Sequence, residues 1–286
     1  MMVGGPSFRP ISDRRPWTFY VLGGLFAAWL VFLYGPMFVI YVLSFQGENG
    51  GVTFPMVGTS TIWFQDIVKP GQMANIPVSF RRSIGLAAIV SGITVVFAVA
   101  AALGFRRKFP GSGFVFYMAV ASLVMPGLLI GFGIGLGFKF LGWQTGLFTS
   151  ALGAQLTWTL PFGLFAMFAV VNRFNRSWEE AAADLGANAW QRLRHITLPI
   201  LLPGILGVAM GALTLSYDEY ARTTLTIGPL NTLPLEIYAL ISSATSPTLF
   251  AIGTLTTSAS FLIITTTLFL VFRMQRRRSL ASLKAE

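Results

Sequence analysis

The chain has 286 residues, of which 54% are hydrophobic and only 10% are charged, and its mean hydropathy is +0.70. Soluble globular domains carry about 25% charged residues, so this composition excludes a water-soluble globule and indicates an integral membrane protein. The formal net charge of +10 is interpreted as a signature of membrane topology, and no nucleic-acid partner is expected.

Six apolar runs are long enough to cross a hydrocarbon core about 30 Å thick as helices of about 20 residues. They are continuous and not alternating, which favours helices over barrel strands. The first run is too long for a signal peptide and has no small-residue cleavage site. The sequence therefore predicts an all-α polytopic membrane protein with six transmembrane helices, over residues 17–45, 83–105, 114–138, 147–171, 200–226 and 248–272.

Basic residues are concentrated on one side of this topology. Fifteen of the 20 Lys and Arg residues lie before the first run, after the second, between the fourth and fifth, or after the sixth. The positive-inside rule then places both termini in the cytoplasm. We expect a cytoplasmic tail over residues 1–16, a first transmembrane helix over 17–45, an extracytoplasmic loop over 46–80, a five-helix core over 81–272 and a basic cytoplasmic tail over 273–286.

Two features of the first half refine this organisation. The long loop is rich in Gly, Pro, Thr and Asn, with a short surface helix expected around residues 61–68 and Arg81 and Arg82 at the outer interface. The third run carries glycines behind Pro126, several of them four residues apart. This spacing predicts a face that another helix approaches closely, although general flexibility is an alternative. The glycines are Gly127, Gly131, Gly133, Gly135 and Gly137.

A polar island separates the fourth and fifth runs. Ser177 and Glu180 have the spacing of a capping box at a helix start, and Glu179 adds favourable charge near the same terminus. Gly186 suits a tightly packed, left-handed position that ends this helix. Asn188 with Gln191 repeats the capping pattern. The island is therefore predicted to form a helix, a glycine elbow and a second short helix.

The island also resembles a known motif. Glu180, Ala181, Ala182, Gly186, Ile196, Leu198 and Pro199 match every fixed position of the EAA loop of inner-membrane permeases of binding-protein-dependent ABC importers. Weaker matches extend the resemblance over residues 83–272, and they look most similar to the spermidine/putrescine-type branch. These stretches are 105–110, Met125-Pro126, 215–219, 228–229 and 233–238.

The resemblance implies the type I ABC importer permease (MetI-like) fold in a bacterial inner membrane. It assigns ATPase coupling to the loop over residues 173–199, through Glu179, Glu180, Ala181, Ala182, Asp184, Leu185, Gly186, Ile196, Leu198 and Pro199. The implied partners are two copies of a cytosolic ABC ATPase, a second permease subunit, homologous or identical, an extracytoplasmic solute-binding protein and the lipid bilayer. The implied solute is polyamine-like or another small cationic or amino compound.

The chain itself is expected to be a transport subunit and not an enzyme. It has no Walker-type phosphate loop, so ATP and Mg are expected on the partner ATPase and no cofactor on this chain. It has no cysteine, which excludes a cysteine-based metal site, and no metal site is expected. A secondary transporter, or a membrane scaffold without ATPase coupling, is the alternative, although neither accounts for an EAA loop.

Charged residues in the fifth run are candidates for the substrate path or gate. Asp218 and Glu219 lie where carboxylates normally face a cavity or a partner, and either is a candidate ligand for a cation. Arg222 follows Asp218 by four residues, so an ion pair between these two is the alternative. Tyr217 and Tyr220 offer aromatic faces to a cation or anchor the helix at the interface. Trp158 and Glu236 are further candidates with the same ambiguity.

Overall fold

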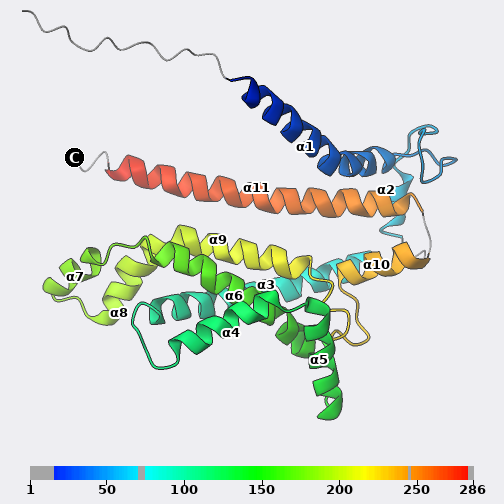
Figure 1. The fold of residues 1–286 in the computed structure, drawn as a ribbon. Coiled ribbons are helices and arrows are strands. Elements are labelled where there is room, and N and C mark those ends of the chain that lie inside the picture. The colour runs from blue at the N-terminus through cyan, green and yellow to red at the C-terminus, as the bar shows by residue number, and fades with distance from the viewer. Residues whose placement is uncertain (1–15, 70–74, 244–245, 283–286) are drawn as a thin grey trace, which may run out of the picture.

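The computed structural model describes residues 16–69, 75–243 and 246–282 of the chain, and these ranges fold into helices joined by loops (Figure 1). The expected tail over residues 1–16 therefore lies almost wholly outside the described residues, as do Arg9, Arg14, Arg15 and Lys284. Within the described ranges, the all-α prediction is confirmed. An isolated bridge between Gln46 and Thr59 is the one piece of β pairing found there.

Three helices form the centre of the molecule. These are α3 (Ile76–Gly104), α6 (Leu152–Val171) and α9 (Leu198–Tyr217), and each packs against the other two. Small side chains allow the close approach: a Cβ atom on Gly163 of α6 would lie 2.6 Å from Cγ2 of Thr94 on α3. In membranes, where water does not drive helices together, such small-residue contacts supply much of the packing.

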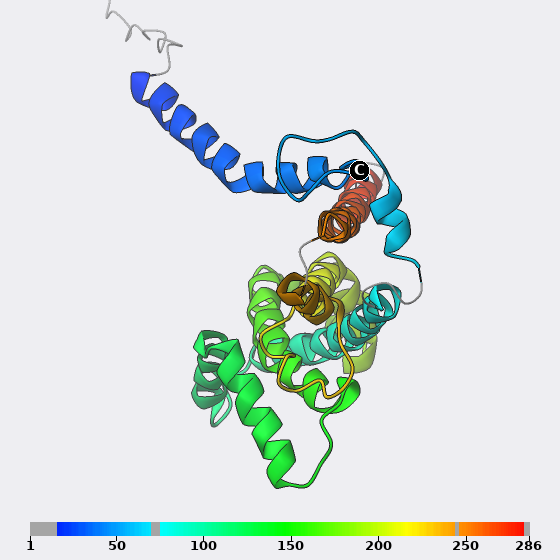
Figure 2. The same cartoon turned by 90° about the vertical axis from the view of Figure 1, so that its right-hand side faces the viewer.

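Two long helices lie beside this centre. α11 (Thr248–Ser282) packs between α9 and α1 (Trp17–Leu43), as Figures 1 and 2 both show. The hydroxyl groups of Tyr41 and Ser258 are 3.2 Å apart across the α1–α11 contact. Most apolar side chains of α1 are exposed, which suits a helix that faces lipid. The first and last predicted spans are confirmed as helices.

The third predicted span is not one straight helix. α4 (Ser112–Val124) and α5 (Gly127–Phe140) meet at an angle of 106°. The break falls at Met125-Pro126, because Pro126 has no N–H to donate and forces the preceding residue out of the helical region; Met125 has a ψ of 134°. If this bent pair counts as one span, the described residues contain six candidate spans, and five otherwise.

Other boundaries also differ from the prediction. α3 begins at Ile76, so Arg81 and Arg82 belong to the helix. α2 (Ile62–Asp66) confirms the short helix in the long loop. The fifth span was predicted to reach residue 226, but α9 ends at Tyr217, and an irregular segment follows until α10 (Leu233–Ser243), which was not predicted. A local hydrogen bond accounts for the early end of α9. The side chain of Glu219 accepts the backbone N–H of Arg222, which in a continuing helix would donate to a backbone carbonyl.

The helices give the molecule two distinct ends. α7 (Ser177–Asp184) and α8 (Ala189–Arg192) lie at one end, and α2 and α10 lie at the other (Figure 1). Two short π-helical turns precede long helices: η1 (Leu147–Ala151) leads into α6, and η2 (Leu193–Thr197) joins α8 to α9. The polar island is therefore held directly on the central helix α9.

Candidate functional site

The first helix of the polar island begins differently from the prediction. The capping box at Ser177 and Glu180 does not form, because Arg176 is already helical, with a φ of −67° and a ψ of −23°, and serves as the N-cap. Ser177 therefore lies inside the helix. Its N–H donates instead to Oδ1 of Asn175 at 3.1 Å. The N-terminus is stabilised by this turn and by the nearby charges of Glu179 and Glu180.

The glycine elbow is confirmed in its backbone geometry. Gly186 has a φ of +86°, its N–H donates to the carbonyl of Ala183, and the N–H of Ala187 donates to the carbonyl of Ala182, both at 2.9 Å. This pair of bonds is the Schellman motif that ends helices at a left-handed residue. The expectation of tight packing is wrong for the isolated chain, because no atom lies within 4 Å of a Cβ placed on Gly186.

The second capping box is confirmed. The N–H of Gln191 donates to Oδ1 of Asn188 at 2.9 Å, and the N–H of Asn188 donates to Oε1 of Gln191 at 2.8 Å. Each side chain satisfies a backbone donor that α8 would otherwise leave unpaired. Asn188 and Gln191 thus fix where the chain leaves the elbow, so α7, Gly186 and α8 form one preorganised unit.

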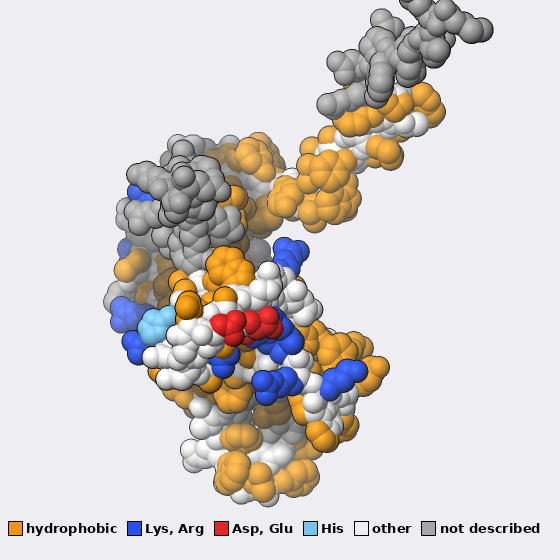
Figure 3. All heavy atoms as spheres, turned by 90° about the vertical axis from the view of Figure 1, so that its left-hand side faces the viewer, with side chains coloured by type: hydrophobic (Ala, Val, Ile, Leu, Met, Phe, Trp, Pro, Cys, Tyr) orange, Lys and Arg blue, Asp and Glu red, His pale blue; other side chains and the backbone are white. Residues whose placement is uncertain are grey.

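This unit exposes apolar side chains at a polar end of the molecule. Leu185 is 90% exposed beside the elbow, and Trp178 and Trp190 are also exposed. Figure 3 shows this end, with Asp and Glu side chains in one band and Lys and Arg side chains beside them. An exposed leucine next to a rigid turn is suited to inserting into a partner, because little conformational freedom is lost on binding. The other residues assigned to coupling lie on α7 or where η2 enters α9. On α7, Ala182 is half-buried, whereas Glu180, Ala181 and Asp184 are exposed. Ile196 lies in η2, and Leu198 and Pro199 lie at the start of α9.

Glu179 anchors the unit to the bundle, a role that the sequence did not indicate. Nη1 of Arg106, just beyond α3, lies 3.0 Å and 3.1 Å from the two carboxylate oxygens of Glu179. The hydroxyl of Thr197 donates to the same carboxylate at 2.5 Å. Burial opposes ionisation of Glu179, but the bonds from Thr197 and Arg106 and the charges of Arg106 and Arg192 outweigh it, so its pKa lies below the usual value.

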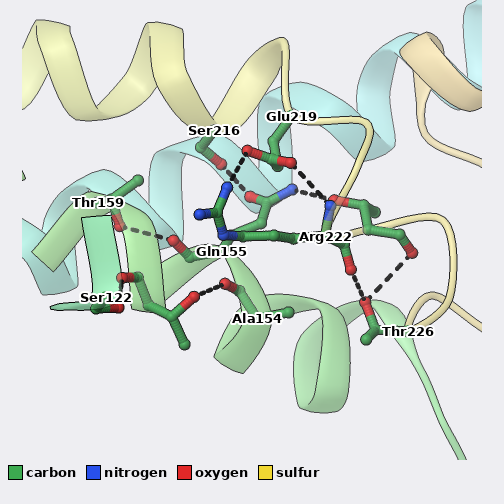
Figure 4. Close-up of polar contacts among 10 residues, drawn as sticks. Ser122, Ala154, Gln155, Thr159, Ser216, Glu219, Arg222 and Thr226 are labelled. Carbon is green, nitrogen blue, oxygen red and sulfur yellow. Dashed lines mark hydrogen bonds and ion pairs between the residues drawn. The ribbon is translucent and has the colours of Figure 1, made fainter. Parts of the chain in front are cut away.

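The charged residues after α9 do not form the ion pair between Asp218 and Arg222 that was the alternative from the sequence. Arg222 does not pair with Asp218, because the helix that would align them ends at Tyr217. Instead, Glu219 accepts both the backbone N–H of Arg222 at 2.8 Å and its Nη1 at 3.3 Å. The guanidinium carbon of Arg222 lies 4.8 Å from the ring centre of Trp158 on α6. Arg222 and Glu219 therefore form a buried ion pair (Figure 4), and the half-buried ring of Trp158 completes this cluster.

The glycines of α5 pack against this cluster. Cβ atoms on Gly127, Gly131 and Gly135 would lie 2.8 Å, 2.7 Å and 2.6 Å from atoms of the segment that contains Arg222 and Leu225. The prediction of a close-packed face is confirmed for these three positions. The expected partner was a helix, which is wrong: the partner is the irregular segment after α9. Gly133 and Gly137 have open space instead.

A buried polar network that was not predicted from the sequence lies beside the cluster. Nε2 of Gln155 on α6 donates to Oγ1 of Thr223 at 2.9 Å, and Ser216 on α9 donates to Oε1 of the same glutamine (Figure 4). Thr94 and Thr159 extend the network towards α3, with 2.9 Å between their hydroxyl oxygens. The signal that was available is Gln155 itself, an amide inside an apolar run, where it needs hydrogen-bond partners.

Asp218 lies apart from the ion pair, in an aromatic setting. A cavity of about 310 Å³ is lined by Asp218, Tyr217, Tyr220 and Tyr238, among others. The rings of Tyr220 and Tyr238 are 4.9 Å apart. A carboxylate among tyrosine faces is a chemically suitable site for an organic cation. Glu236 does not join it, because its Oε2 accepts a hydrogen bond from Asn231 Nδ2 at 2.7 Å.

Known proteins share both the sequence pattern and the fold. The family model described as "Binding-protein-dependent transport system inner membrane component" matches residues 92–279. The spermidine/putrescine transport system permease protein PotC of Escherichia coli (strain K12) is 28% identical over 235 residues, which cover 82% of this chain and 87% of that protein. The putrescine transport system permease protein PotI of the same strain is 28% identical over 274 residues, which cover 93% and 94%.

Solved transporters share the fold at lower identity. A chain of a bacterial ABC transporter involved in the import of the acidic polysaccharide alginate matches with a TM-score of 0.62 and 17% identity, covering 90% of this chain and 96% of that one. A chain of the MetNI methionine ABC transporter, in an inward-facing conformation, matches with a TM-score of 0.53 and 16% identity, covering 71% and 99%. At this identity the likeness is one of fold alone.

Proposed function

The chain belongs to the family of binding-protein-dependent transport system inner membrane components, and we propose that it forms half of the translocation pathway for a polyamine-like cation. As a member of this family it is a multi-pass permease subunit of an ABC importer and not an enzyme. The finer proposal concerns three matters: how the chain is coupled to ATP hydrolysis, which solute it passes, and which partners complete the pathway.

Coupling is assigned to the unit made of α7, Gly186 and α8. The observation that carries this assignment is the exposed side chain of Leu185, presented beside a Schellman turn at the polar end of the molecule. Glu179 fixes the unit to Arg106 and, through Thr197, to the start of α9. A push on Leu185 from a cytosolic ATPase would therefore be transmitted to α9 and α3. Two such ATPases, each carrying ATP and Mg, would act on the two halves of the pathway.

A cationic solute is supported by the chemistry around Asp218. Among the charged groups after α9, Glu219 is already occupied by Arg222, whereas Asp218 lines a cavity with Tyr217, Tyr220 and Tyr238. Carboxylates and aromatic faces together are suited to protonated amines. The relatives named for spermidine and putrescine transport support the same class of solute. We place Arg222 and Trp158 in the wall of the pathway, as positioning residues for the segment that holds Asp218.

The partners follow from the same arrangement. We propose that a second permease subunit, either a homologous chain or a second copy, covers α5. This helix extends away from the bundle (Figure 2), and several of its apolar side chains are exposed. An extracytoplasmic binding protein would deliver the solute at the α2 and α10 end. Residues 46–80 would then lie on the outer side of a bacterial inner membrane. The cytoplasmic side would hold both termini, with the basic tail, and residues 173–199, which is what the positive-inside rule predicts.

The coupling proposal is tested by replacing Leu185 with serine in the reconstituted transporter with its ATPase and binding protein. Because Leu185 is 90% exposed in the isolated chain, the variant is expected to fold and reach the membrane normally. ATP turnover stimulated by the loaded binding protein should fall about tenfold, the effect of losing one well-packed apolar contact worth about 1.5 kcal/mol. The matched control is Leu25→Ser, an exposed leucine on α1. Equal turnover in both variants would refute the assignment.

A further inference from the structure

A second cavity lies at the α7 end of the molecule, away from the proposed solute path. It has a volume of about 440 Å³ and opens among the ends of α3, α4 and α6 and the loop before α7. Its lining combines two guanidinium groups and an amide with a group of phenylalanine rings. The polar members are Arg106, Asn172 and Arg176, and the aromatic members include Phe105, Phe116 and Phe168.

The charge in this cavity is only partly compensated. Arg106 uses Nη1 to bind Glu179, but its Nη2 is buried and has no hydrogen-bond partner among the described residues. Arg176 donates from Nη2 to the backbone carbonyl of Arg106 at 3.0 Å. Within the described ranges, no carboxylate lies within ion-pair distance of Arg176. Only one of the two guanidinium groups is therefore paired with a carboxylate, which leaves a positive site with an unused donor.

The position of the cavity matches the boundary between hydrocarbon and headgroups. α3 ends at Gly104 and α6 ends at Val171, and both helices are candidate membrane spans. The cavity is lined by the last turns of these two helices and by the first residues beyond them, including Phe105 and Asn172. It thus sits where a span leaves the apolar core.

The apolar wall of the cavity is a cluster of packed phenylalanine rings. The ring of Phe168 lies 5.2 Å from that of Phe105 and 6.4 Å from that of Phe116. A ligand held here would have its charged group against the arginines and an apolar part against these rings. A phospholipid has this division, and basic pockets at the cytoplasmic ends of transmembrane helices are a known type of site for anionic headgroups.

We propose that this cavity binds the phosphate group of an anionic phospholipid. Arg176 and Asn172 contact the phosphate from the rim, Nη2 of Arg106 provides a further donor, and Phe105, Phe116 and Phe168 contact the start of an acyl chain. Because Arg106 also holds Glu179, the bound phosphate would brace the anchor of α7. Inorganic phosphate offers the same charged group without the acyl chain, so the test separates these two sources.

The experiment uses the complete transporter in phosphatidylcholine nanodiscs that contain a small fraction of photoactivatable phosphatidylglycerol. Labelling of peptides that carry Phe116 or Phe168 is measured for the unchanged chain, for Arg176→Gln and for Arg173→Gln. Arg173 is the matched control, because it is an exposed arginine of the same loop that does not line the cavity. We expect labelling to fall about tenfold in Arg176→Gln, since a charge-assisted contact is lost, and about twofold or less in Arg173→Gln, whose charge is screened.

Three results decide the matter. Arg176-dependent labelling that inorganic phosphate at millimolar concentration does not displace supports a lipid ligand. Displacement by inorganic phosphate alone would overturn the lipid source in favour of a soluble phosphate compound. Equal labelling in both variants, or the same labelling with a photoactivatable phosphatidylcholine, would overturn the site itself. Gel filtration, which measures whether each variant remains associated with the ATPase, establishes that the compared transporters are intact.

Discussion

Replacing Glu179 with glutamine tests whether the Arg106–Glu179 contact holds α7 to the bundle. Glutamine keeps the shape of the side chain and one acceptor oxygen, so the change removes mainly the charge. The two side chains are only 17% and 23% exposed, and two N–O distances are close to 3 Å. The pair therefore resembles a charge-assisted hydrogen bond and not a solvated surface pair. Such a bond contributes about 1.5 kcal/mol or more. A loss of about 1.5 kcal/mol raises the population of detached α7 about tenfold.

Amide hydrogen exchange of peptides that cover α7, measured in the purified transporter, reports this population directly. We expect exchange of α7 in Glu179→Gln to be about tenfold faster than in the unchanged chain, with exchange in α3 and α6 unaltered. The matched control is Glu180→Gln, because Glu180 is exposed on the same helix and makes no ion pair among the described residues. Protection of α7 that is equal in the two variants would refute the anchoring role of Glu179.

The same contact has a predictable dependence on pH. The pKa of Glu179 is lowered in the folded chain, so the carboxylate stabilises the fold at every pH above the usual carboxyl range. This contribution is lost as pH falls through the lowered pKa. Exchange of α7, corrected for its intrinsic pH dependence, should therefore rise in acid for the unchanged chain and stay level for Glu179→Gln. An identical pH profile for both would mean that Glu179 does not carry the effect.

Three further changes test other parts of the structure. Gly131→Ala should lower the stability of the purified chain by about 1–3 kcal/mol, since its Cβ would lie 2.7 Å from the carbonyl oxygen of Arg222, whereas Gly133→Ala, in open space, should not; equal melting temperatures would contradict this packing. Gly186→Val should uncouple ATP turnover from transport, because the φ of +86° at this position costs a residue with a Cβ about 1–2 kcal/mol and distorts the elbow. Gly186→Asn should uncouple it less, because asparagine tolerates this region, and normal turnover in the valine variant would contradict the role of the elbow. Asp218→Asn should raise the polyamine concentration for half-maximal uptake about tenfold, with Glu48→Gln in the outer loop as the control; unchanged uptake kinetics would remove Asp218 from the solute path.

Local patterns in the chain were sufficient for several features of the site. The elbow at Gly186 and the cap at Asn188 and Gln191 depend on bonds between residues no more than five apart, and such bonds leave a signature in the order of residues. The spans depend on the length of apolar runs, which the hydrocarbon thickness dictates. The helix break at Met125-Pro126 also has a local cause, since proline restricts the residue before it, but the continuous apolar run predicts one unbroken helix.

Other features depended on which helices pack together. Arg106 and Glu179 are separated by two transmembrane segments, and Gln155 meets Thr223 across a similar distance in the chain. Nothing in their local sequence marks these pairs, because charge and amide side chains are compatible with many partners. The early end of α9 also depends on distant contacts. The irregular segment that follows it is stabilised by the Glu219–Arg222 pair, by Trp158 of α6 and by the glycines of α5.

Apolar run lengths and local motifs were enough to predict that this chain crosses a membrane, that residues 180–199 carry the EAA pattern and that this segment turns at Gly186. Only the packing of the helices shows that Glu179 bonds to Arg106 and Thr197, and that Asp218, not Glu219, lines a cavity. The physical reason is the range of the interactions. Hydrophobic length and capping act within a segment, whereas a buried charge takes whichever partner the packing of distant helices brings within reach.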